Sequence, residues 1–382
     1  MRIIVGAVIS RSPMVAGSVW NRIHRLIGLQ RLGHEVYFVE EVTEDRCVGA
    51  DGGRAAFEHC VNQKLFRAAM ERFGLVDRSC QIYNRGEATA GLSRQSLVSI
   101  CKDADLLFNM SGHVASDLVL AHVKRRVYVD EDPVYTQLWH AEYGVDQNLA
   151  AHDAFLSVGL HIGTPECCIP DCGVTWRHFL PAVILDWWAP SFDASRQYFT
   201  TIATWSQFGD LAYLGDWYRS KAHELRRFAD LPLRAAQKVS IVLQRESREE
   251  AEVDVLRKNG WMVSGPDDID DLDRYRDFIQ GSRAELGIAK HAYVQARSGW
   301  FSDRSAHYLA SGKPVLAQST GLEDTLPSDR GFLTFTDCDQ AVAGIEAINS
   351  DYQMHCRAAR EFAEEFLDYR RVLPRMIEHS LA

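Results

Sequence analysis

The sequence predicts an α/β protein made of two Rossmann-like domains that face each other. The chain has 382 residues, which is enough for two domains of ordinary size. Patterns of short buried strands alternate with helical patterns along most of its length, and this alternation is interrupted once, by an aperiodic segment around residues 186–198. A content of 46% hydrophobic and 25% charged residues favours folded cores over disorder.

The first domain is expected to cover residues 1–185. It opens with an apolar strand over Arg2–Val8, followed by a helix that starts at the N-cap residue Ser18 and stops at Gly33. The stretch "EVYFVEE" comes next as a second strand, and such a strand, helix, strand unit predicts a right-handed parallel crossover. A helical stretch near residues 55–73 and strands at "DLLFNMS", "RRVYVDED" and "DAFLSVG" continue the pattern.

A linker over residues 186–198 separates this domain from a second one over residues 199–359. The linker contains prolines, aromatic residues and polar residues without a period. The second domain is predicted to alternate strands at 199–205, "KVSIVLQ", "WMVSG" and "HAYVQA" with helices near 218–229, 246–259 and 271–279.

Charge and cysteine content restrict the class of function. A formal net charge of -10 argues against a surface that coats nucleic acid or anionic membrane, so a small-molecule partner is expected. No apolar run has the length of a membrane span, the start of the chain is too short to be a signal peptide, and nine scattered cysteines suit a reducing compartment. We therefore expect a cytoplasmic protein. In "ECCIPDC" two cysteines are adjacent and no second Cys-x-x-Cys occurs, so no metal site is expected.

The segment "RSGWFSDRSAHYLASGKP", residues 297–314, is the main candidate for a binding site. If "HAYVQA" is a strand, this segment leaves its carboxyl end, where ligands of parallel sheets bind. Ser302 is the expected N-cap of a helix over 303–311, whose free amides and dipole favour a diphosphate. Gly299 would permit close approach, Arg297 would add charge, and Asp303 would turn aside to a sugar hydroxyl. The alternative is an ordinary turn between a strand and a helix.

The same segment resembles the donor-binding segment of glycosyltransferases with the two-domain GT-B architecture. Gly299-Trp300 with Ser302 match the motif His-Cys-Gly-Trp-Asn-Ser, and Phe301 with "YLASGKPVL" matches the Phe-Gly and Glu-Ala-Met-Ala-x-Gly-x-Pro-Val pattern. The overall likeness is greatest to uncharacterised bacterial glycosyltransferase-like proteins. Arg297 stands where the first motif has histidine, and Ser305 or His307 where the motifs have the ribose-binding glutamate, so Asp303 or His307 would replace that contact.

This resemblance implies transfer of a sugar from a nucleotide-diphosphate donor to an acceptor, with no cofactor and no essential metal. It also implies that a helix over residues 360–382 crosses back to brace the first domain. Further donor contacts are expected at strand ends and at the first helix, although each of these segments also reads as a plain turn or a solvated helix start. The complete set of predicted donor-binding residues is Ser12, Gly17, Ser206, Gln207, Arg245, Arg297, Ser298, Gly299, Trp300, Phe301, Ser302 and Asp303.

Three residues of the first domain are candidates for the group that receives the acceptor's proton. His113 follows one predicted strand after a Ser-Gly turn, and Asp130 and Asp132 follow another in "VYVDEDP". Alternation predicts that Asp130 and Asp132 share a face, where like charges would raise each other's pKa. Lys290 is expected to be structural.

Two other functions stay open from the sequence, namely a sugar-nucleotide epimerase of the same architecture and a non-catalytic nucleotide-sugar binding protein. The absence of a G-x-G-x-x-G motif in the first loop weakens a third, a nicotinamide-dependent oxidoreductase. Expected partners are a nucleotide-sugar donor, an unidentified acceptor and, as an open alternative, a second copy of the chain in a homodimer.

Overall fold

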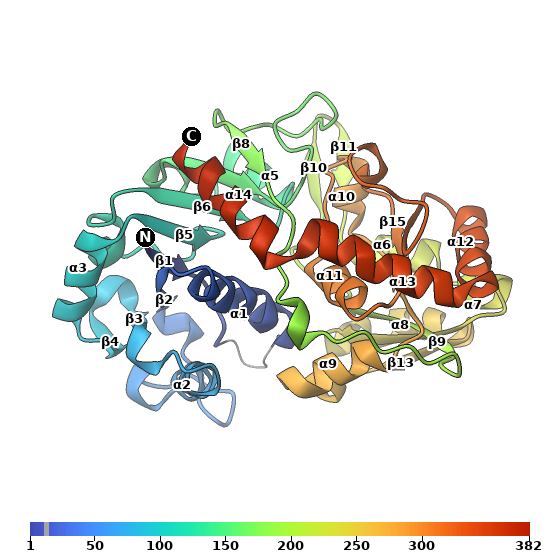
Figure 1. The fold of residues 1–382 in the computed structure, drawn as a ribbon, viewed down its shortest axis with the longest axis horizontal. Helices are drawn as coiled ribbons and strands as arrows, with labels where there is room; N and C mark the ends of the chain where they lie inside the picture. Colours follow the sequence, from blue (N-terminus) through green and yellow to red (C-terminus); the bar gives the residue numbers. More distant parts are fainter. Residues whose placement is uncertain (11–14) are drawn as a thin grey trace.

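A computed structural model describes residues 1–10 and 15–382, and it contains two parallel sheets that lie side by side (Figure 1). The N-terminal sheet has the strand order β4-β3-β2-β1-β5-β6-β7-β8, and only β4 runs antiparallel to its neighbour. Its strands are β1 Arg2–Gly6, β2 Glu35–Val42, β3 Ser79–Tyr83, β4 Ala88–Gly91, β5 Leu106–Met110, β6 Arg126–Asp130, β7 Ala154–Ser157 and β8 Trp176–His178.

The C-terminal sheet has the order β13-β12-β9-β14-β15-β16, and all of its neighbours pair in parallel. Its strands are β9 Tyr198–Thr204, β12 Lys238–Gln244, β13 Trp261–Ser264, β14 Ala284–Gly287, β15 Val315–Gln318 and β16 Phe332–Phe335. A separate antiparallel hairpin joins β10 Leu211–Tyr213 to β11 Asp216–Tyr218. The predicted α/β architecture with two Rossmann-like sheets is therefore confirmed.

Helices cover both sheets, as expected where crossovers connect parallel strands. Those of the first half are α1 Ala16–Arg31, α2 Val61–Arg72, α3 Arg94–Asp103, α4 Asp117–Leu120 and α5 Tyr135–Ala141. Those of the second half are α6 Lys221–Arg227, α7 Leu231–Arg234, α8 Glu250–Lys258, α9 Leu272–Gln280, α10 His291–Gln295, α11 Asp303–Ala310, α12 Cys338–Ser350, α13 Tyr352–Phe362 and α14 Tyr369–Leu381. None of the helices in the described part of the chain combines the length and apolarity needed to span a membrane.

The last helix returns to the N-terminal sheet, as the resemblance implies. A π-helical turn over Ala363–Leu367 separates α13 from α14, and Val183 of the first half pairs with the backbone on either side of Asp368. Helix α14 then packs on α1, where Gly28 provides the space, since a Cβ there would lie 2.7 Å from Leu373 Cδ1. Figure 1 shows α13 and α14, in red, running one after the other across the front of the molecule from the C-terminal half to the N-terminal half.

Three expected elements differ from the structure. Helix α1 begins at Ala16, so Ser18 lies inside it and is not its N-cap residue. The stretch "HAYVQA" forms helix α10, and the strand before it is the shorter "AELG" segment of β14. A short apolar run has too few residues to distinguish a strand from a helix by its period, and the backbone pairing of β14 with β9 and β15 decides the assignment. The helix expected from residue 218 begins at Lys221 because residues 211–218 form the hairpin.

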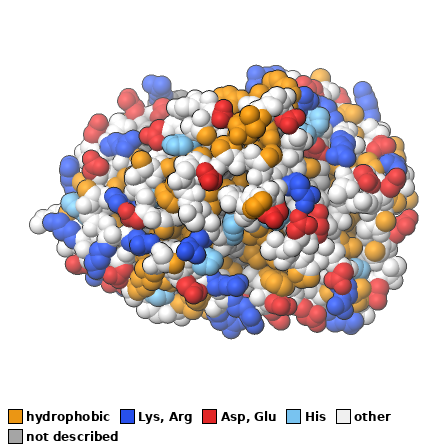
Figure 2. Space-filling view, turned by 90° about the horizontal axis from the view of Figure 1, so that it is seen from above, with side chains coloured by type: hydrophobic (Ala, Val, Ile, Leu, Met, Phe, Trp, Pro, Cys, Tyr) orange, Lys and Arg blue, Asp and Glu red, His pale blue; other side chains and the backbone are white. Residues whose placement is uncertain are grey.

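The surface carries charges of both signs. On the face shown in Figure 2, basic and acidic side chains are intermixed around hydrophobic side chains that gather near the middle. This face therefore has no broad region of one sign.

Candidate active site

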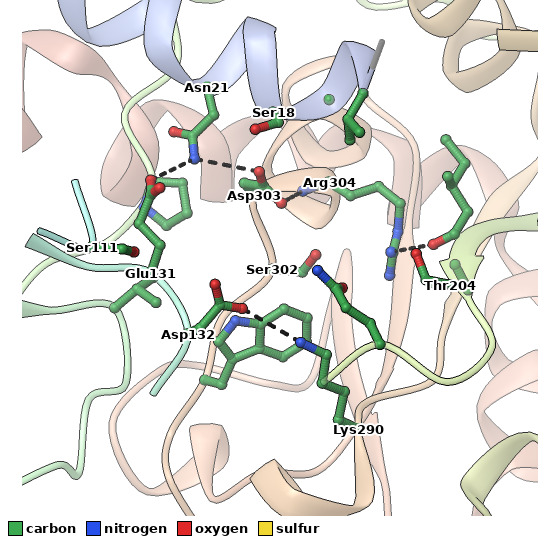
Figure 3. A pocket seen from close by; sticks show the side chains of 18 of the residues that line it. Ser18, Asn21, Ser111, Glu131, Asp132, Thr204, Lys290, Ser302, Asp303 and Arg304 are labelled. Atoms are coloured by element: carbon green, nitrogen blue, oxygen red, sulfur yellow. Dashed lines mark hydrogen bonds and ion pairs between the residues drawn. The ribbon is translucent and has the colours of Figure 1, made fainter. Parts of the chain in front are cut away.

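A cavity of about 420 Å³ lies between the two sheets. Its lining comes from the carboxyl ends of strands in both halves, which include Val8 after β1, Ser111 after β5, Glu131 after β6, Thr204 of β9 and Gln244 of β12. The start of α1 and the start of α11 complete the wall (Figure 3). This is the position at which parallel α/β sheets bind ligands.

Cationic side chains outnumber carboxylates among the described residues that line this cavity. Five basic residues and three acidic residues line it, whereas the whole chain has a net charge of -10. Such a concentration of positive charge in a largely enclosed space favours an anionic ligand. The basic residues are Arg22, Arg25, Lys221, Lys290 and Arg304, and the acidic ones are Glu131, Asp132 and Asp303.

Lys290 belongs to the wall provided by the C-terminal sheet. It lies three residues after β14 and is 7% exposed, with its ammonium 3.0 Å from the Tyr293 hydroxyl, 3.4 Å from Asp132 Oδ1 and 4.1 Å from the Phe208 ring centre. Burial lowers the pKa of Lys290, and the charge of Asp132 opposes that shift. The sequence analysis expected Lys290 to be structural, whereas the structure places its side chain in the cavity wall, because the residues after it form α10 and not a strand.

Two more cations lie beside Lys290. The Lys221 ammonium donates to the Ile288 carbonyl oxygen, and burial, with the charges of Arg304 and Lys290, lowers the pKa of Lys221 well below its usual value. The Arg304 guanidinium donates to Glu285 and to the Ile202 carbonyl oxygen. Both cations are thus fixed by groups behind the wall while their side chains border the cavity.

The start of α11 provides free backbone amides at the same wall. Ser302 is the N-cap residue, but its side chain accepts no hydrogen bond from the helix, and Asp303 Oδ1 accepts the N–H of Arg304. The remaining first-turn amides and the positive end of the helix dipole favour an anion. Ser302, Trp300 and Phe301, which the sequence analysis predicts as donor contacts, line the cavity.

A group of charged residues forms the opposite wall. Glu131 accepts hydrogen bonds from Arg22, from Arg25 at 2.7 Å and from the Asn21 amide at 3.1 Å, and the same amide lies 3.3 Å from Asp303 Oδ2. Asn21 therefore connects Glu131 of the first half to Asp303 of the second. Burial alone would raise the pKa of Glu131, but the charges of Arg22 and Arg25 outweigh burial and hold it below the usual value.

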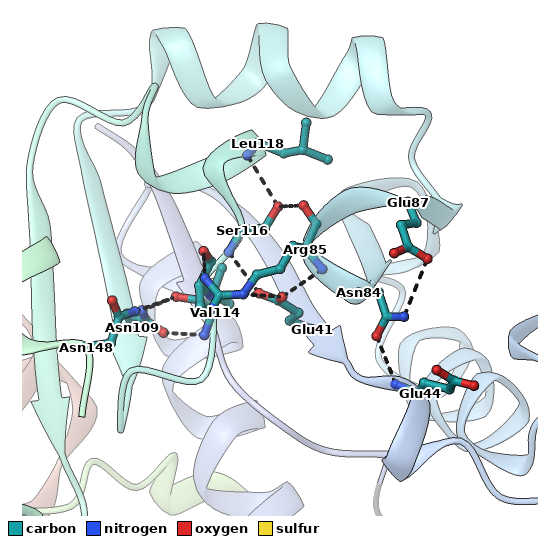
Figure 4. A network of polar contacts seen from close by, with 11 residues as sticks. Glu41, Glu44, Asn84, Arg85, Glu87, Asn109, Val114, Ser116, Leu118 and Asn148 are labelled. Carbon is teal, nitrogen blue, oxygen red and sulfur yellow. Dashed lines mark hydrogen bonds and ion pairs between the residues drawn. The ribbon is translucent and has the colours of Figure 1, made fainter. Parts of the chain in front are cut away.

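His113 lines the cavity, and a network of polar contacts holds the chain segment that follows it, from Val114 to Ser116 (Figure 4). The Glu41 carboxylate accepts N–H groups from Arg85, Ala115 and Ser116. The Asn109 side chain binds both the N–H and the carbonyl oxygen of Val114. His113 is half-buried, and its charge when protonated contributes to the lowered pKa of Glu131.

Asp130 supports the site from behind and does not line it. The carboxylate is fully buried and accepts hydrogen bonds from Thr136 at 2.8 Å, Gln137 at 3.0 Å and Ser157 at 2.8 Å. Burial raises the pKa of Asp130 to about 6 despite these bonds. The expectation that Asp130 shares a face with Asp132 fails because β6 ends at Asp130, after which the chain turns.

The turn after β6 is strained. Val134 has φ 76° and ψ -53°, a backbone conformation that β-branched residues rarely adopt. Its N–H donates to Gln137 Oε1 at 2.6 Å, while the N–H of Asp132 donates to Asp130 Oδ1 at 3.1 Å. These bonds hold the strained turn and direct Asp132 into the cavity, close to Lys290.

Arg297, Ser298 and Gly299 lie outside the cavity. The carbonyl oxygens of Ser298 and Gly299 accept the N–H groups of His161 and Leu160 at 3.1 and 3.0 Å. A Cβ at Gly299 would lie 3.0 Å from both of those backbone nitrogens, so the close approach at this glycine is made by chain and not by phosphate. Arg297 pairs with Asp324 at 2.6 Å on the exterior.

Of the remaining predicted donor contacts, some line the cavity and others do not. Gly17 and Gln207 line the cavity. Ser206 donates to Glu249, and Arg245 pairs with Glu250, so neither reaches the cavity. Ser12 lies outside the described residues. The structure thus brings together Gly17, His113, Asp132, Gln207, Trp300, Phe301, Ser302 and Asp303.

Several residues that the sequence analysis did not select line the same cavity, including Arg22, Glu131, Lys221 and Arg304. Their positions just after a strand or in the first turns of a helix were the available signal. His307, by contrast, is buried and stacks on Trp188 with ring centres 4.3 Å apart, and burial lowers the pKa of His307 to about 3. His307 therefore packs the two halves together and does not face the cavity.

The described residues contain one group with the separations of metal ligands, formed by His223, Glu224 and His291 outside the cavity. Arg219 donates its backbone N–H to His291 Nδ1 at 3.2 Å. The proton of a neutral His291 ring then resides on Nε2, so that nitrogen has no lone pair for a metal. The cysteines of "ECCIPDC" do not form such a group; Cys168 contacts the Tyr218 hydroxyl, and Cys172 contacts the Gln137 carbonyl oxygen.

The chain has the GT-B fold. Among solved structures it is similar to Anabaena Alr3699/HepE in complex with UDP and glucose, at 11% identity and TM-score 0.61 over 99% of this chain and 98% of that chain. An alpha-glucosyltransferase in complex with UDP and a 13-mer DNA matches at 12% identity and TM-score 0.60 over 100% of both chains. Sucrose-phosphate synthase from Thermosynechococcus elongatus matches at 12% identity and TM-score 0.56 over 99% and 98%. No protein-family model and no curated protein matches the sequence.

Proposed function

We propose that the protein is a glycosyltransferase that moves a sugar from a nucleoside-diphosphate donor to an acceptor. The observation that carries this proposal is the cavity between facing carboxyl ends of two Rossmann-like sheets. One wall has Lys221, Lys290, Arg304 and a helix start, and the other has Glu131, Asp132 and His113 together with two arginines that pair with Glu131. The similar solved structures are of glycosyl-transferring enzymes, two of them with UDP in the complex, which supports the same class of donor here.

The donor's diphosphate is proposed to contact Lys221, Lys290 and Arg304 at the start of α11. The adjoining part of the cavity, at the ends of β9, β12 and β13, is mainly apolar, with Ile202, Val242 and Ile269 as examples, and suits a flat base. Charge that develops on the leaving diphosphate would be stabilised by cations already in place. Because these cations supply the positive charge that a metal would otherwise provide, we propose transfer without an essential metal.

The acceptor's proton is proposed to pass to Asp132 or His113, which both border the cavity on the side of the N-terminal sheet. Of the neighbouring carboxylates Glu131 and Asp132, Asp132 is the more accessible, since its side chain is 35% exposed and that of Glu131 is 12% exposed. Asp132 Oδ1 lies 3.4 Å from the Lys290 ammonium. A diphosphate that attracts the Lys290 ammonium would leave the Asp132 carboxylate available for the acceptor hydroxyl.

A thermal-shift screen against nucleoside diphosphates and their sugars tests the donor class, because a ligand bound by the native state raises its melting temperature. We expect at least one nucleotide to raise the Tm of the wild type, and to raise that of Lys290→Met less at the same nucleotide concentration. Incubation of that nucleotide sugar with candidate acceptors then distinguishes the products. A free nucleoside diphosphate together with a glycosylated acceptor supports transfer, whereas an isomerised donor formed without any acceptor would indicate epimerase activity.

A further inference from the structure

Aromatic rings surround the ammonium group of Lys290. The Lys290 nitrogen lies 4.1 Å from the ring centre of Phe208, 5.0 Å from that of Tyr135 and 5.1 Å from that of Tyr293. The face of an aromatic ring carries partial negative charge, so each ring within about 6 Å attracts the ammonium. We refer to Tyr135, Phe208 and Tyr293 as the aromatic cage. It contains residues of both halves of the chain, since Tyr135 belongs to α5 and Phe208 follows β9.

Contacts among the rings hold the cage together. The ring centre of Tyr135 lies 5.0 Å from that of Phe208 and 6.1 Å from that of Tyr293. Trp139 packs edge-on against Phe208, with ring centres 5.1 Å apart. Tyr135 and Tyr293 are buried, and Phe208 is partly buried in the cavity wall. The cage is therefore already assembled next to the cavity.

The backbone at Phe208 is strained. Its φ is 74°, in a region that residues with a side chain rarely adopt, and Gly209 follows with φ 75°. Such a conformation is unfavourable for phenylalanine and persists only where the surrounding structure requires it. The cage ring that lies nearest to the Lys290 ammonium is thus the one presented by a strained backbone.

The cage stabilises the charge of Lys290 without neutralising it. Burial lowers the pKa of Lys290, and the Asp132 carboxylate that opposes this shift is 3.4 Å away (Figure 3). Arg304, by comparison, pairs with the full negative charge of Glu285. An aromatic ring carries no net charge, so an incoming diphosphate can pair with the ammonium while the rings remain in contact with it.

Ionisable groups from several elements neighbour this ammonium. They are Asp132 after β6, Tyr135 on α5, Lys221 on α6 and Tyr293 on α10. Burial raises the pKa of both tyrosines above the usual value of about 10, so they stay uncharged near neutral pH. Lys221 contacts a different ring, that of Trp300, at 6.0 Å. A change at Phe208 therefore acts first on Lys290.

We infer that Phe208 is a positioning residue for donor binding, because its ring, with those of Tyr135 and Tyr293, keeps the Lys290 ammonium charged and in place for the diphosphate. This inference rests on the proposed function, which puts the diphosphate at Lys290. It goes further by giving an uncharged side chain a role in donor affinity that is exerted through Lys290.

A double-mutant cycle tests the inference by calorimetric titration of the whole protein with UDP, or with the nucleoside diphosphate that the thermal-shift screen selects. Phe208→Leu removes the ring and keeps an apolar side chain. It should weaken binding about 3- to 30-fold in the wild type and less than about twofold in Lys290→Met, where no ammonium is present. Phe208→Tyr retains a ring and should bind like the wild type.

The matched control is Trp217→Leu. It removes a ring that lies 5.8 Å from the Arg219 guanidinium on the exposed hairpin, outside the cavity, and should leave the Kd unchanged. Unfolding curves confirm that each variant is folded, and Phe208→Met replaces Phe208→Leu if the latter does not fold.

The pH dependence of binding is a second measurement, which a loss of packing alone would not change. Without the Phe208 ring the charged form of Lys290 is less favoured, so the pKa of Lys290 falls further. Between about pH 7.5 and 9 the phosphates keep a constant charge. In this window binding to Phe208→Leu should weaken at a lower pH than binding to the wild type.

The outcomes separate this inference from the proposed function. An equal loss of affinity in the wild type and in Lys290→Met would show that Phe208 contacts the nucleotide directly, and would overturn the inference while leaving the donor class intact. Unchanged affinity of Phe208→Leu, or a pH profile that matches the wild type, would overturn it in the same way. Failure of the wild type to bind any nucleoside diphosphate would overturn the proposed function, and the inference with it.

Discussion

Replacement of Lys290 by methionine removes one charge from the cationic wall while keeping a side chain of similar length. Lys290 is 7% exposed, and the acidic contact of its ammonium among the described residues, Asp132, is at the long distance of 3.4 Å. A diphosphate in the cavity would therefore compete well with Asp132 for the Lys290 ammonium. A hydrogen bond between charged groups contributes about 1.5–3 kcal/mol net, which corresponds to about 10- to 150-fold in Kd.

Calorimetric titration of the wild type and of Lys290→Met with a nucleoside diphosphate measures this loss of affinity. Unfolding curves of both proteins confirm that the variant is folded. Burial already disfavours the charged form of Lys290, so we expect little loss of stability. Arg297→Ala is the matched control, because Arg297 pairs with Asp324 on the exterior and should leave the Kd unchanged. A loss of affinity in Arg297→Ala but not in Lys290→Met would refute the placement of the diphosphate and restore the prediction made from the sequence.

Three further predictions concern catalysis, pH and packing. Asp132→Asn should lower kcat at least about tenfold and change the donor Kd less than about threefold, as expected for loss of a general base. Steady-state kinetics and a donor titration measure the two effects, and an unchanged kcat would contradict the role of Asp132 as a base. Burial raises the pKa of Glu40 to about 7, so between about pH 4.5 and 7 the native state binds more protons than the unfolded state, and this group's contribution to stability increases as the pH falls. Glu40→Gln should make urea-denaturation stability less dependent on pH in that window, and an unaltered slope would speak against it. Gly331→Ala should cost about 2–4 kcal/mol, because its Cβ would lie 2.2 Å from the Ala359 nitrogen, whereas Gly74→Ala, also at positive φ but with no atom within 4 Å, should cost only about 1 kcal/mol in the same assay.

The early part of the fold was predictable from local pattern. The strand at the start of the chain, the helix that follows it and "EVYFVEE" correspond to β1, α1 and β2, since buried parallel strands and amphipathic helices have distinct periods. The second half was less regular. "HAYVQA" has the composition of a strand but forms α10. The strand at this place in the sheet is β14, and the pairing between distant strands that decides this cannot be seen in a short stretch of sequence.

The candidate site was predictable in part. Ser302, Asp303 and His113 follow from the rule that ligands bind at strand ends and helix starts, and the structure places all three in the cavity wall. Gly299 did not follow that rule. Its lack of a side chain makes room for the backbone of Leu160 and His161. The sequence around Gly299 does not reveal that this distant segment, and not a ligand, occupies the space.

By itself the sequence determined the fold class, the position of the α11 start and the chemistry expected there, because these depend on period, capping and local composition. Only the tertiary structure decided which charges meet. Lys290 and Asp132 are 158 positions apart along the chain, and Asn21 and Asp303 are 282 apart, yet each pair lies within hydrogen-bonding distance in one cavity. The physical reason is that a cavity between two sheets is assembled from the ends of many strands, and their mutual placement is fixed by packing over the whole chain and not by neighbouring residues.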